Sequence, residues 1–207
     1  MKTLVLLSGG LDSVGALLWA LAHSADAEAL FCAYGQPAAR NEKASAFRTC
    51  SELLVPLHTC DLGAVYAGTK EGLFSTRDSA RAVNRDTAFV PCRNPLLISA
   101  AAATALSRWP GQRTRIVVGF NSHDSAGFPD CSARFVEAMG EVLNVGMGAD
   151  LLRIDAPWID STKLQIVQWV KENCPHHMRL IKESWSCYRA DGPCGACTAC
   201  VVRGAVA

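Results

Sequence analysis

The feature that most constrains the fold of this chain is the alternation of short apolar segments with longer segments of helical spacing. The apolar segments predict buried β-strands at residues 3–7, 29–34, 55–62, 115–120 and 151–156. The segments between them predict α-helices at residues 13–22, 41–54, 93–109, 131–144 and 162–173. Apolar strands that alternate with helices are typical of a doubly wound parallel sheet, so we expect an α/β protein.

The domain organisation follows from where this alternation stops. The chain has 207 residues, enough for one α/β domain with a full core and a small appendage. From about residue 176 the sequence becomes cysteine-rich and loop-like. We therefore expect a main domain over residues 1–175 and a small C-terminal lobe over residues 176–207. Residues 63–88 are polar without clear periodicity, and they are expected to form a long loop over a site.

The charge balance excludes some partners. Lys and Arg number 20 and Asp and Glu number 19, which gives a formal net charge of +1. Such a chain lacks the basic surface by which proteins hold nucleic acid. No stretch approaches the roughly 20 apolar residues of a membrane helix, and the first residues do not follow the pattern of a signal peptide. We expect a cytoplasmic protein that binds neither membranes nor nucleic acid.

A glycine-rich turn, LSGGLDS at residues 7–13, separates the first predicted strand from the first predicted helix. Glycines let a backbone turn sharply and approach a ligand closely. The free N–H groups of such a turn and the positive end of the following helix attract anions. Ser8 and Ser13 add hydroxyl donors. The pattern predicts an anion site, with an ordinary strand-to-helix turn as the alternative.

This turn is neither of the commoner nucleotide motifs, because it lacks the lysine of the P-loop and the third glycine of the dinucleotide fingerprint. Asp12 within it either caps the helix or meets a Mg²⁺ ion that bridges phosphates. The turn resembles the pyrophosphate loop (PP-loop) of ATP pyrophosphatases, which holds the pyrophosphate released when ATP adenylates a substrate oxygen. The resemblance implies ATP binding by Leu7, Ser8, Gly9, Gly10, Leu11, Asp12 and Ser13.

Four of the ten cysteines crowd into one short segment near the C-terminus. They are spaced C-x6-C-x2-C-x2-C, at Cys187, Cys194, Cys197 and Cys200. Four thiolates suit a tetrahedral structural Zn²⁺ ion, and such an ion would fold a tail that has little apolar surface of its own. An iron–sulfur cluster, a redox pair at Cys194 and Cys197, and unligated core thiols are the alternatives.

Taken together, the motifs resemble the 7-cyano-7-deazaguanine synthases over essentially the whole chain. The matching segments, in family order, are LSGGLDS at 7–13, AYGQ at 33–36, FVPCRN at 89–94, GFPDC at 127–131 and SCY…CGACTAC at 186–200. The resemblance implies an ATP-dependent carbon–nitrogen ligase, with a PP-loop domain, a Cys₄ zinc lobe and a homodimeric assembly. In that family ATP adenylates the carboxylate of 7-carboxy-7-deazaguanine, ammonia displaces AMP, and a second activation dehydrates the amide to the nitrile. The implied cofactors are ATP, Mg²⁺ and Zn²⁺.

The resemblance also assigns roles to individual residues. Arg93 would stabilise negative charge during adenylation, and Lys163 and Asp12 would complete the catalytic set. Asp130 would accept hydrogen bonds from the guanine-like N–H edge, and Phe128 would offer a flat surface to the purine. The implied substrate-binding residues are Tyr34, Gln36, Arg93, Asp124, Phe128, Pro129 and Asp130.

These residues also have plainer interpretations. Arg93 could be an exposed arginine at a helix start, and Lys163 a solvated side chain. Asp130 could cap the helix that follows it, and Phe128 could fill the core.

The chain departs from the family pattern around the expected substrate pocket, which marks it as a divergent member. It has Phe128 where the family commonly has tyrosine, Ser132 in place of arginine and Cys92 in place of glycine. Residues 37–40 replace a common Arg-His, and Ser122 stands where an acidic residue is expected. The PP-loop and the four cysteines are intact.

Three further functions therefore stay open. A divergent relative could join the same acid to another amine, such as a protein amine, in an antiviral defence system. A PP-loop enzyme of tRNA or sulfur transfer could use Cys92 or Cys131 as a nucleophile, although the neutral charge disfavours tRNA. A pure nucleotide-binding module is a third possibility, which would bind ATP without releasing AMP.

Overall fold

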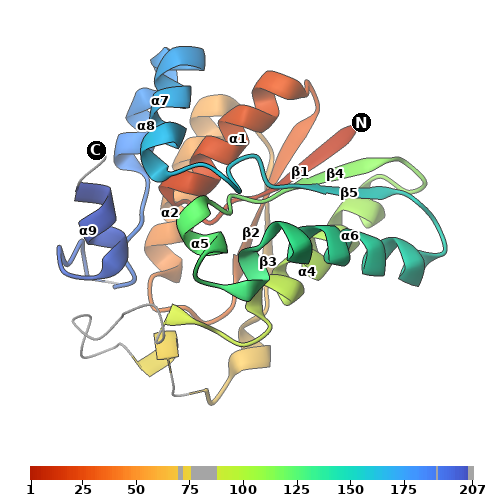
Figure 1. Ribbon diagram of the computed structural model, residues 1–207, viewed down its shortest axis with the longest axis horizontal. Coiled ribbons are helices and arrows are strands. Elements are labelled where there is room, and N and C mark those ends of the chain that lie inside the picture. Colours follow the sequence, from red (N-terminus) through yellow and green to blue (C-terminus); the bar gives the residue numbers. More distant parts are fainter. Residues whose placement is uncertain (70–71, 76–87, 190, 205–207) are drawn as a thin grey trace.

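The computed structural model describes residues 1–69, 72–75, 88–189 and 191–204 (Figure 1). The described residues form a five-stranded parallel sheet in the order β3-β2-β1-β4-β5. The strands are β1 (Lys2–Leu6), β2 (Ala27–Ala33), β3 (Leu57–Asp61), β4 (Thr114–Val117) and β5 (Leu152–Asp155). The predicted doubly wound α/β fold is confirmed.

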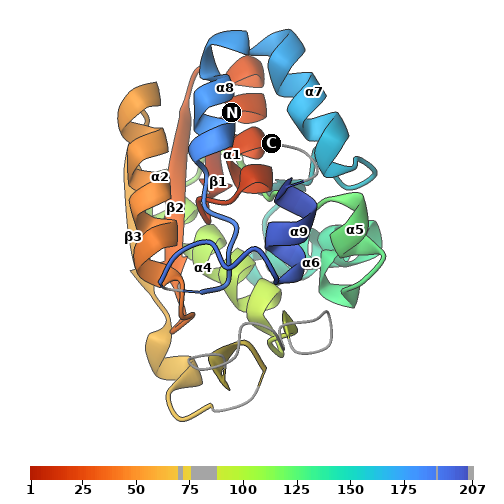
Figure 2. The same ribbon diagram turned by 90° about the vertical axis from the view of Figure 1, so that its left-hand side faces the viewer.

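The helices lie on both faces of this sheet (Figures 1 and 2). The α-helices are α1 (Leu11–His23), α2 (Ala39–Leu53), α4 (Arg93–Arg108), α5 (Ser122–Ser125), α6 (Ala133–Met147), α7 (Lys163–Asn173), α8 (Met178–Glu183) and α9 (Thr198–Gly204). Single 3₁₀ turns are η1 (Gly63–Tyr66), η2 (Gly72–Ser75), η4 (Pro129–Cys131) and η5 (Pro175–His177). Helices α1, α2, α7 and α8 pack on one face, and α4 and α6 pack on the other.

The core has two layers because neighbouring residues of each strand point to opposite faces. In β1, Leu4 joins the cluster under α4 and α6, and Val5 joins the cluster under α1. In register with them, Leu4 pairs with Ile116 and Val5 with Val117 of β4. Strand order reverses between β1 and β4, so the crevice outside their carboxyl ends is where such sheets bind ligands.

Several predicted element boundaries differ from the structure. The predicted helix at 131–144 begins instead at Ala133, because the Ser132 hydroxyl accepts a hydrogen bond from the Phe135 N–H at 3.2 Å and caps it. The interpretation of Asp130 as that cap is therefore wrong. The loop predicted at 63–88 contains η1 and η2, and its residues 70–71 and 76–87 lie outside the described residues.

The C-terminal segment begins as part of the main core. Leu180 and Ile181 of α8 are buried in the cluster beneath α1. The four cysteines follow, in the part of the chain that includes α9 and that we call the cysteine lobe (described residues 187–189 and 191–204). The short helices α5, α8 and α9 were not predicted from the sequence, and the domain division at residue 175 stays a prediction.

Candidate functional site

A cavity of about 270 Å³ opens at the carboxyl ends of the strands, beside the point where strand order reverses. Its polar and aromatic lining includes Ser8, Asp12, Ser13, Tyr34, Gln36, Glu42, Arg93, Asn94, Asp124, Phe128 and Tyr188. These residues come from the segments that follow β1 and β2, from α1, α2, α4 and α5, from the residue before η4, and from the cysteine lobe. The topology thus gathers polar groups from distant parts of the sequence into one cavity.

The glycine-rich turn leaves β1 through a conformation that only glycine fits. Gly9 has φ +83°, and a Cβ atom placed on it would lie 2.3 Å from the carbonyl oxygen of Glu42. The Gly9 carbonyl accepts hydrogen bonds from the Ser45 hydroxyl and from the Trp185 N–H, each at 2.8 Å. The turn is therefore pressed against α2 and held from two sides.

Gly10 is the N-cap of α1, and no side chain caps this helix. The interpretation of Asp12 as the helix cap is therefore wrong. The Ser8 hydroxyl lies 3.0 Å from that of Ser13, which in turn donates to the Gly10 carbonyl at 2.9 Å. The first turn of α1 thus keeps main-chain N–H groups and two hydroxyls beside the cavity, as an anion site requires.

Asp12, in the first turn of α1, forms an ion pair through its Oδ2 with Lys163, the first residue of α7. The second carboxylate oxygen of Asp12, Oδ1, is buried and has no hydrogen-bond partner among the described residues. Asp124 lies nearby, and burial together with the Asp12 charge raises the pKa of its carboxyl. Asn121 holds Asp124 by a side-chain hydrogen bond of 2.6 Å within a capping box at α5. The carboxylates of Asp12 and Asp124 therefore both interact with Lys163.

Gly119 follows β4 and touches the first turn of α1. A Cβ atom on it would lie 2.9 Å from the carbonyl carbon of Asp12 and 2.9 Å from the nitrogen of Ser13. Sequence reasoning missed this residue, because the contact joins segments far apart in the chain. Its signal was a glycine at the end of a buried strand, which often marks close approach of another backbone.

Arg93 begins α4 and lines the same cavity as the first turn of α1. Its guanidinium carbon is 5.9 Å from the centre of the Tyr34 ring, and its Nε donates to Asn94 Oδ1 at 3.2 Å. Arg93 is half-buried, so it is more than an exposed arginine at a helix start. The preceding Cys92 has φ +55°, a region that favours glycine. That backbone explains why glycine is common there in the family pattern.

Gln36 forms hydrogen bonds with both Tyr34 and Glu42. Its Oε1 accepts from the Tyr34 N–H at 2.8 Å, and its Nε2 donates to Glu42 Oε2 at 2.9 Å. Burial raises the pKa of the Glu42 carboxyl to about 7, although the Gln36 hydrogen bond and the Arg93 charge oppose the rise. Glu42 was not predicted as a site residue. Its only sequence signal is an acidic residue in the first turn of a helix.

Exchanging Glu42 for glutamine is expected to stabilise the fold at alkaline pH and to change little at acid pH. The unfolded chain releases this proton near 4.5, whereas the folded protein holds it until about pH 7. Stability of the wild type therefore falls as the pH rises between these values, by about 3 kcal/mol at most. Urea unfolding at about pH 5 and about pH 8 measures the difference.

The control for this prediction is the exposed Glu137, which lies on α6 away from the cavity. Glu137→Gln is expected to follow the wild-type pH dependence. If Glu42→Gln did so as well, the raised pKa of Glu42 would be wrong.

The predicted substrate residues do not all line the cavity. Tyr34, Gln36, Arg93, Asp124 and Phe128 do, and the Phe128 ring stacks on Phe89 with ring centres 6.4 Å apart.

Pro129 is exposed, and neither it nor Asp130 belongs to the cavity lining. Asp130 Oδ2 is nevertheless buried without a hydrogen-bond partner among the described residues. Asn94 connects the cavity lining, to which it belongs, with Asp130, because its side-chain amide donates to the Asp130 carbonyl at 3.2 Å.

The four clustered cysteines converge as their spacing predicts. Their Sγ atoms all lie within 4.8 Å of one another, and those of Cys194 and Cys200 are 3.9 Å apart. Four thiolates about one Zn²⁺ ion at ~2.3 Å would be separated by about 3.8 Å. Main-chain N–H groups of Arg189 and Cys194 point at the Cys187 sulfur, each at 3.4 Å. The donor set and its spacing fit a tetrahedral metal ion.

The remaining cysteines give little support to a thiol nucleophile. Cys131 lines the cavity but is buried, and burial raises the pKa of its thiol. Cys92 is exposed and does not line the cavity. A buried thiol with a raised pKa stays protonated and inert near neutral pH.

Within the described residues, no helix has both the length and the apolar character needed to cross a bilayer.

Comparison with known proteins adds sequence and fold relatives. The family model described as "Queuosine biosynthesis protein QueC" matches residues 2–206. The 7-cyano-7-deazaguanine synthase of Methanocaldococcus jannaschii is 32% identical over 219 residues, which cover 98% of this chain and 93% of that protein. The protein of the same name from Campylobacter concisus is 32% identical over 210 residues, covering 98% and 91%.

A solved structure shares the fold. The NMN synthetase from Francisella tularensis aligns with a TM-score of 0.52 at 16% identity, over 98% of this chain and 75% of that one. At this identity the likeness concerns the fold alone.

Proposed function

The chain belongs to the QueC family of queuosine biosynthesis proteins, and on that premise we propose that it converts 7-carboxy-7-deazaguanine into 7-cyano-7-deazaguanine with ATP. The substrate carboxylate attacks the α-phosphorus of ATP, pyrophosphate leaves, and an acyl adenylate forms. Ammonia then attacks the acyl carbon and AMP leaves, which gives the amide. A second adenylation on the amide oxygen, followed by loss of AMP and protons, gives the nitrile.

The observation that best supports this proposal is that one cavity joins the glycine-rich turn to Arg93. Adenylation needs donors for the leaving pyrophosphate and a positive group beside the α-phosphate. The N–H groups of the turn and the hydroxyls of Ser8 and Ser13 bind the pyrophosphate. Arg93 lines the same cavity and stabilises the charge that develops during attack.

Lys163 and Asp12 act at the phosphate end. Lys163 neutralises the phosphates once its ion pair with Asp12 loosens on ligand binding. The unpartnered Asp12 Oδ1 and the carboxylate of Asp124 supply oxygen ligands of the kind that Mg²⁺ prefers. A bound Mg²⁺ ion would neutralise phosphate charge there.

The deazapurine lies towards Phe128 and Tyr34. Phe128 offers its ring to the base, and Tyr34 and Gln36 form the wall beside Arg93. Asp130 binds the guanine-like N–H edge when its buried, unpartnered oxygen turns towards the cavity. Pro129 shapes the turn between Phe128 and Asp130.

The cysteine lobe holds a structural zinc ion through its four thiolates. Cys197→Ser is expected to abolish stoichiometric zinc and to lower the melting temperature by about 4–8 °C or more, because the lobe has little apolar surface to fold it without metal. Metal analysis and a thermal scan of both proteins measure this. Cys174→Ser, a thiol outside the cluster, is the control. Iron with visible absorbance in the wild type would instead identify an iron–sulfur cluster.

The test of the proposed function is a mass-spectrometric assay with ATP, Mg²⁺, 7-carboxy-7-deazaguanine and ammonia, following AMP and every deazapurine species. A nitrile product with AMP supports the proposal. AMP with an amide or adenylated acid that persists would mean that activation is kept and the acceptor is another amine, such as one on a protein. Absence of substrate-dependent AMP would overturn the proposal.

A further inference from the structure

The segment that leads from α8 into the cysteine lobe contacts the glycine-rich turn through the main chain of Trp185. The Trp185 N–H donates to the Gly9 carbonyl at 2.8 Å, and the Ser45 hydroxyl donates to the same oxygen. The C=O of Gly9 and the N–H of Gly10 belong to one planar peptide and point in opposite directions. Holding the carbonyl on the Trp185 side therefore keeps the Gly10 N–H turned the other way. The orientation of a donor in the turn depends on a residue from the far end of the chain.

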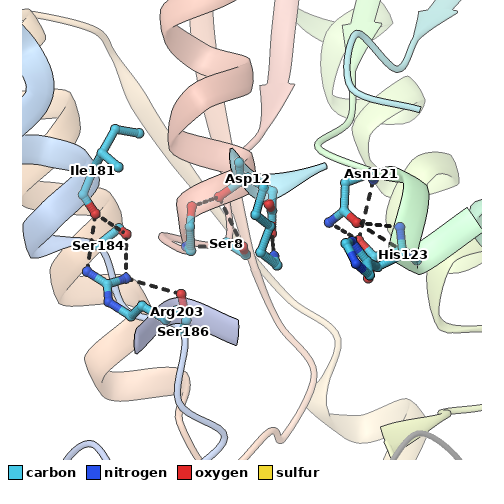
Figure 3. Close-up of polar contacts among 12 residues, drawn as sticks. Ser8, Asp12, Asn121, His123, Ile181, Ser184, Ser186 and Arg203 are labelled. Atoms are coloured by element: carbon cyan, nitrogen blue, oxygen red, sulfur yellow. Dashed lines mark hydrogen bonds and ion pairs between the residues drawn. The ribbon is translucent and has the colours of Figure 1, made fainter. Parts of the chain in front are cut away.

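Arg203 fixes the segment that carries Trp185. Its guanidinium Nη1 donates to the hydroxyls of Ser184 at 2.8 Å and Ser186 at 3.2 Å, the two neighbours of Trp185 in sequence (Figure 3). Its Nη2 donates to the Ile181 carbonyl at 3.2 Å. Arg203 belongs to α9, the helix that also carries the cysteine ligand Cys200. Because several hydrogen bonds hold the planar guanidinium of Arg203 at once, it cannot move without moving residues 184–186.

A second connection runs through Tyr188. It directly follows Cys187, lines the cavity and packs against a cluster that includes Tyr34. The Trp185 indole N–H donates to the Cys187 carbonyl at 2.8 Å, which ties the two connections together. Tyr188 of the cysteine lobe thus forms part of the cavity wall, and Trp185, just before the lobe, makes the contact to Gly9.

From these contacts we infer that the cysteine lobe, when it holds its metal, sets the conformation of the glycine-rich turn, and that Arg203 is the positioning residue that transmits this. Loss of the metal would release α9, then the serines on either side of Trp185, and then the Gly9 carbonyl. Because the proposed function places ATP on this turn, metal and nucleotide would each raise the other's affinity, as linkage requires. The lobe is in this sense part of the ligand site.

The test compares Arg203→Met with Arg179→Met, in the metal-loaded protein. Arg179 is an exposed arginine of α8 that pairs with Glu52 and does not contact Trp185. Hydrogen exchange of the Trp185 amide and of residues 8–13 is expected to be about tenfold faster in Arg203→Met and unchanged in Arg179→Met. ATP affinity measured by calorimetry is expected to fall about tenfold in Arg203→Met, within the usual range of coupling. Exchange within twofold of wild type, with metal retained, would overturn the inference.

Wild-type protein gives a second measurement if Arg203→Met fails to fold. A chelator is expected to remove the metal several-fold more slowly when ATP is present, and to speed exchange in residues 8–13 once the metal is gone. If hydrogen exchange in residues 8–13 stayed the same after the metal was removed, the inference would be overturned. Wild type that binds no ATP, yet loses protection at Trp185 with its metal, would overturn the proposed function and leave the structural link standing.

Discussion

Gly9→Ala is expected to lower the free energy of unfolding by about 4 kcal/mol or more and to abolish ATP binding by whatever folded protein remains. The φ of +83° alone disfavours any side chain, and the added Cβ would meet the Glu42 carbonyl oxygen at 2.3 Å. That oxygen is main chain, so α2 or the turn must move. Movement of the turn breaks the contacts of Gly9 with Ser45 and Trp185. Urea unfolding and calorimetry with ATP measure the two effects.

Gly148→Ala separates the cost of the backbone conformation from the cost of the clash. Gly148 has φ +62°, but nothing lies within 4 Å of the place where its Cβ would be. This variant is expected to lose only about 1 kcal/mol. An equal loss in both variants would show that the close packing of Gly9 against α2 is not what makes glycine necessary there.

Arg93→Met is expected to lower kcat/KM for AMP formation by about 10²–10³-fold, or roughly 3–4 kcal/mol of transition-state stabilisation. The guanidinium is a positive group in the cavity that the glycine-rich turn also lines, and methionine keeps the unbranched apolar stem without the charge. Because the interaction matters most as charge develops, the loss is expected mainly in kcat. Steady-state kinetics with AMP detection measure it.

Arg113→Met provides the matched control, since Arg113 is an exposed arginine outside the cavity lining and, among the described residues, pairs with the exposed Asp150. Its activity is expected to stay within about twofold of wild type, as surface pairs contribute little. Arg93→Lys is expected to recover part of the lost rate, because it restores charge but not the planar fork. Wild-type kinetics in a folded Arg93→Met protein would remove Arg93 from the proposed mechanism.

The sequence was sufficient for the features that depend on local pattern. Apolar strands such as residues 3–7 and 115–120 stand out because both of their faces are buried. The glycine-rich turn at residues 7–13 is recognisable because its glycines, serines and Asp12 stand together in the sequence, between an apolar strand and a helix. The four cysteines converge as their spacing predicts, since small residues between Cys194, Cys197 and Cys200 allow the tight turns that one metal needs.

What the sequence did not reveal are the contacts made across the chain. Glu42 enters the cavity only because α2 packs its first turn against Gly9, and no local pattern marks that. Gly119 matters because β4 ends beside α1. Asp130 illustrates the reverse error, since the sequence suggested a helix cap and the hydroxyl two residues later took that place. Each of these outcomes depends on tertiary packing, which periodicity does not encode.

The hydrogen bond between Trp185 and Gly9 has a consequence for the order of assembly. Gly9 is synthesised long before Trp185, so on the ribosome the turn waits for all the residues between them before its partner exists. The central strand β1 waits as well, because one of its two neighbours, β4, begins only at Thr114. Contacts of such long range slow folding and leave apolar strands uncovered meanwhile. Strand β1 and the glycine-rich turn are thus synthesised well before the segments that complete their contacts.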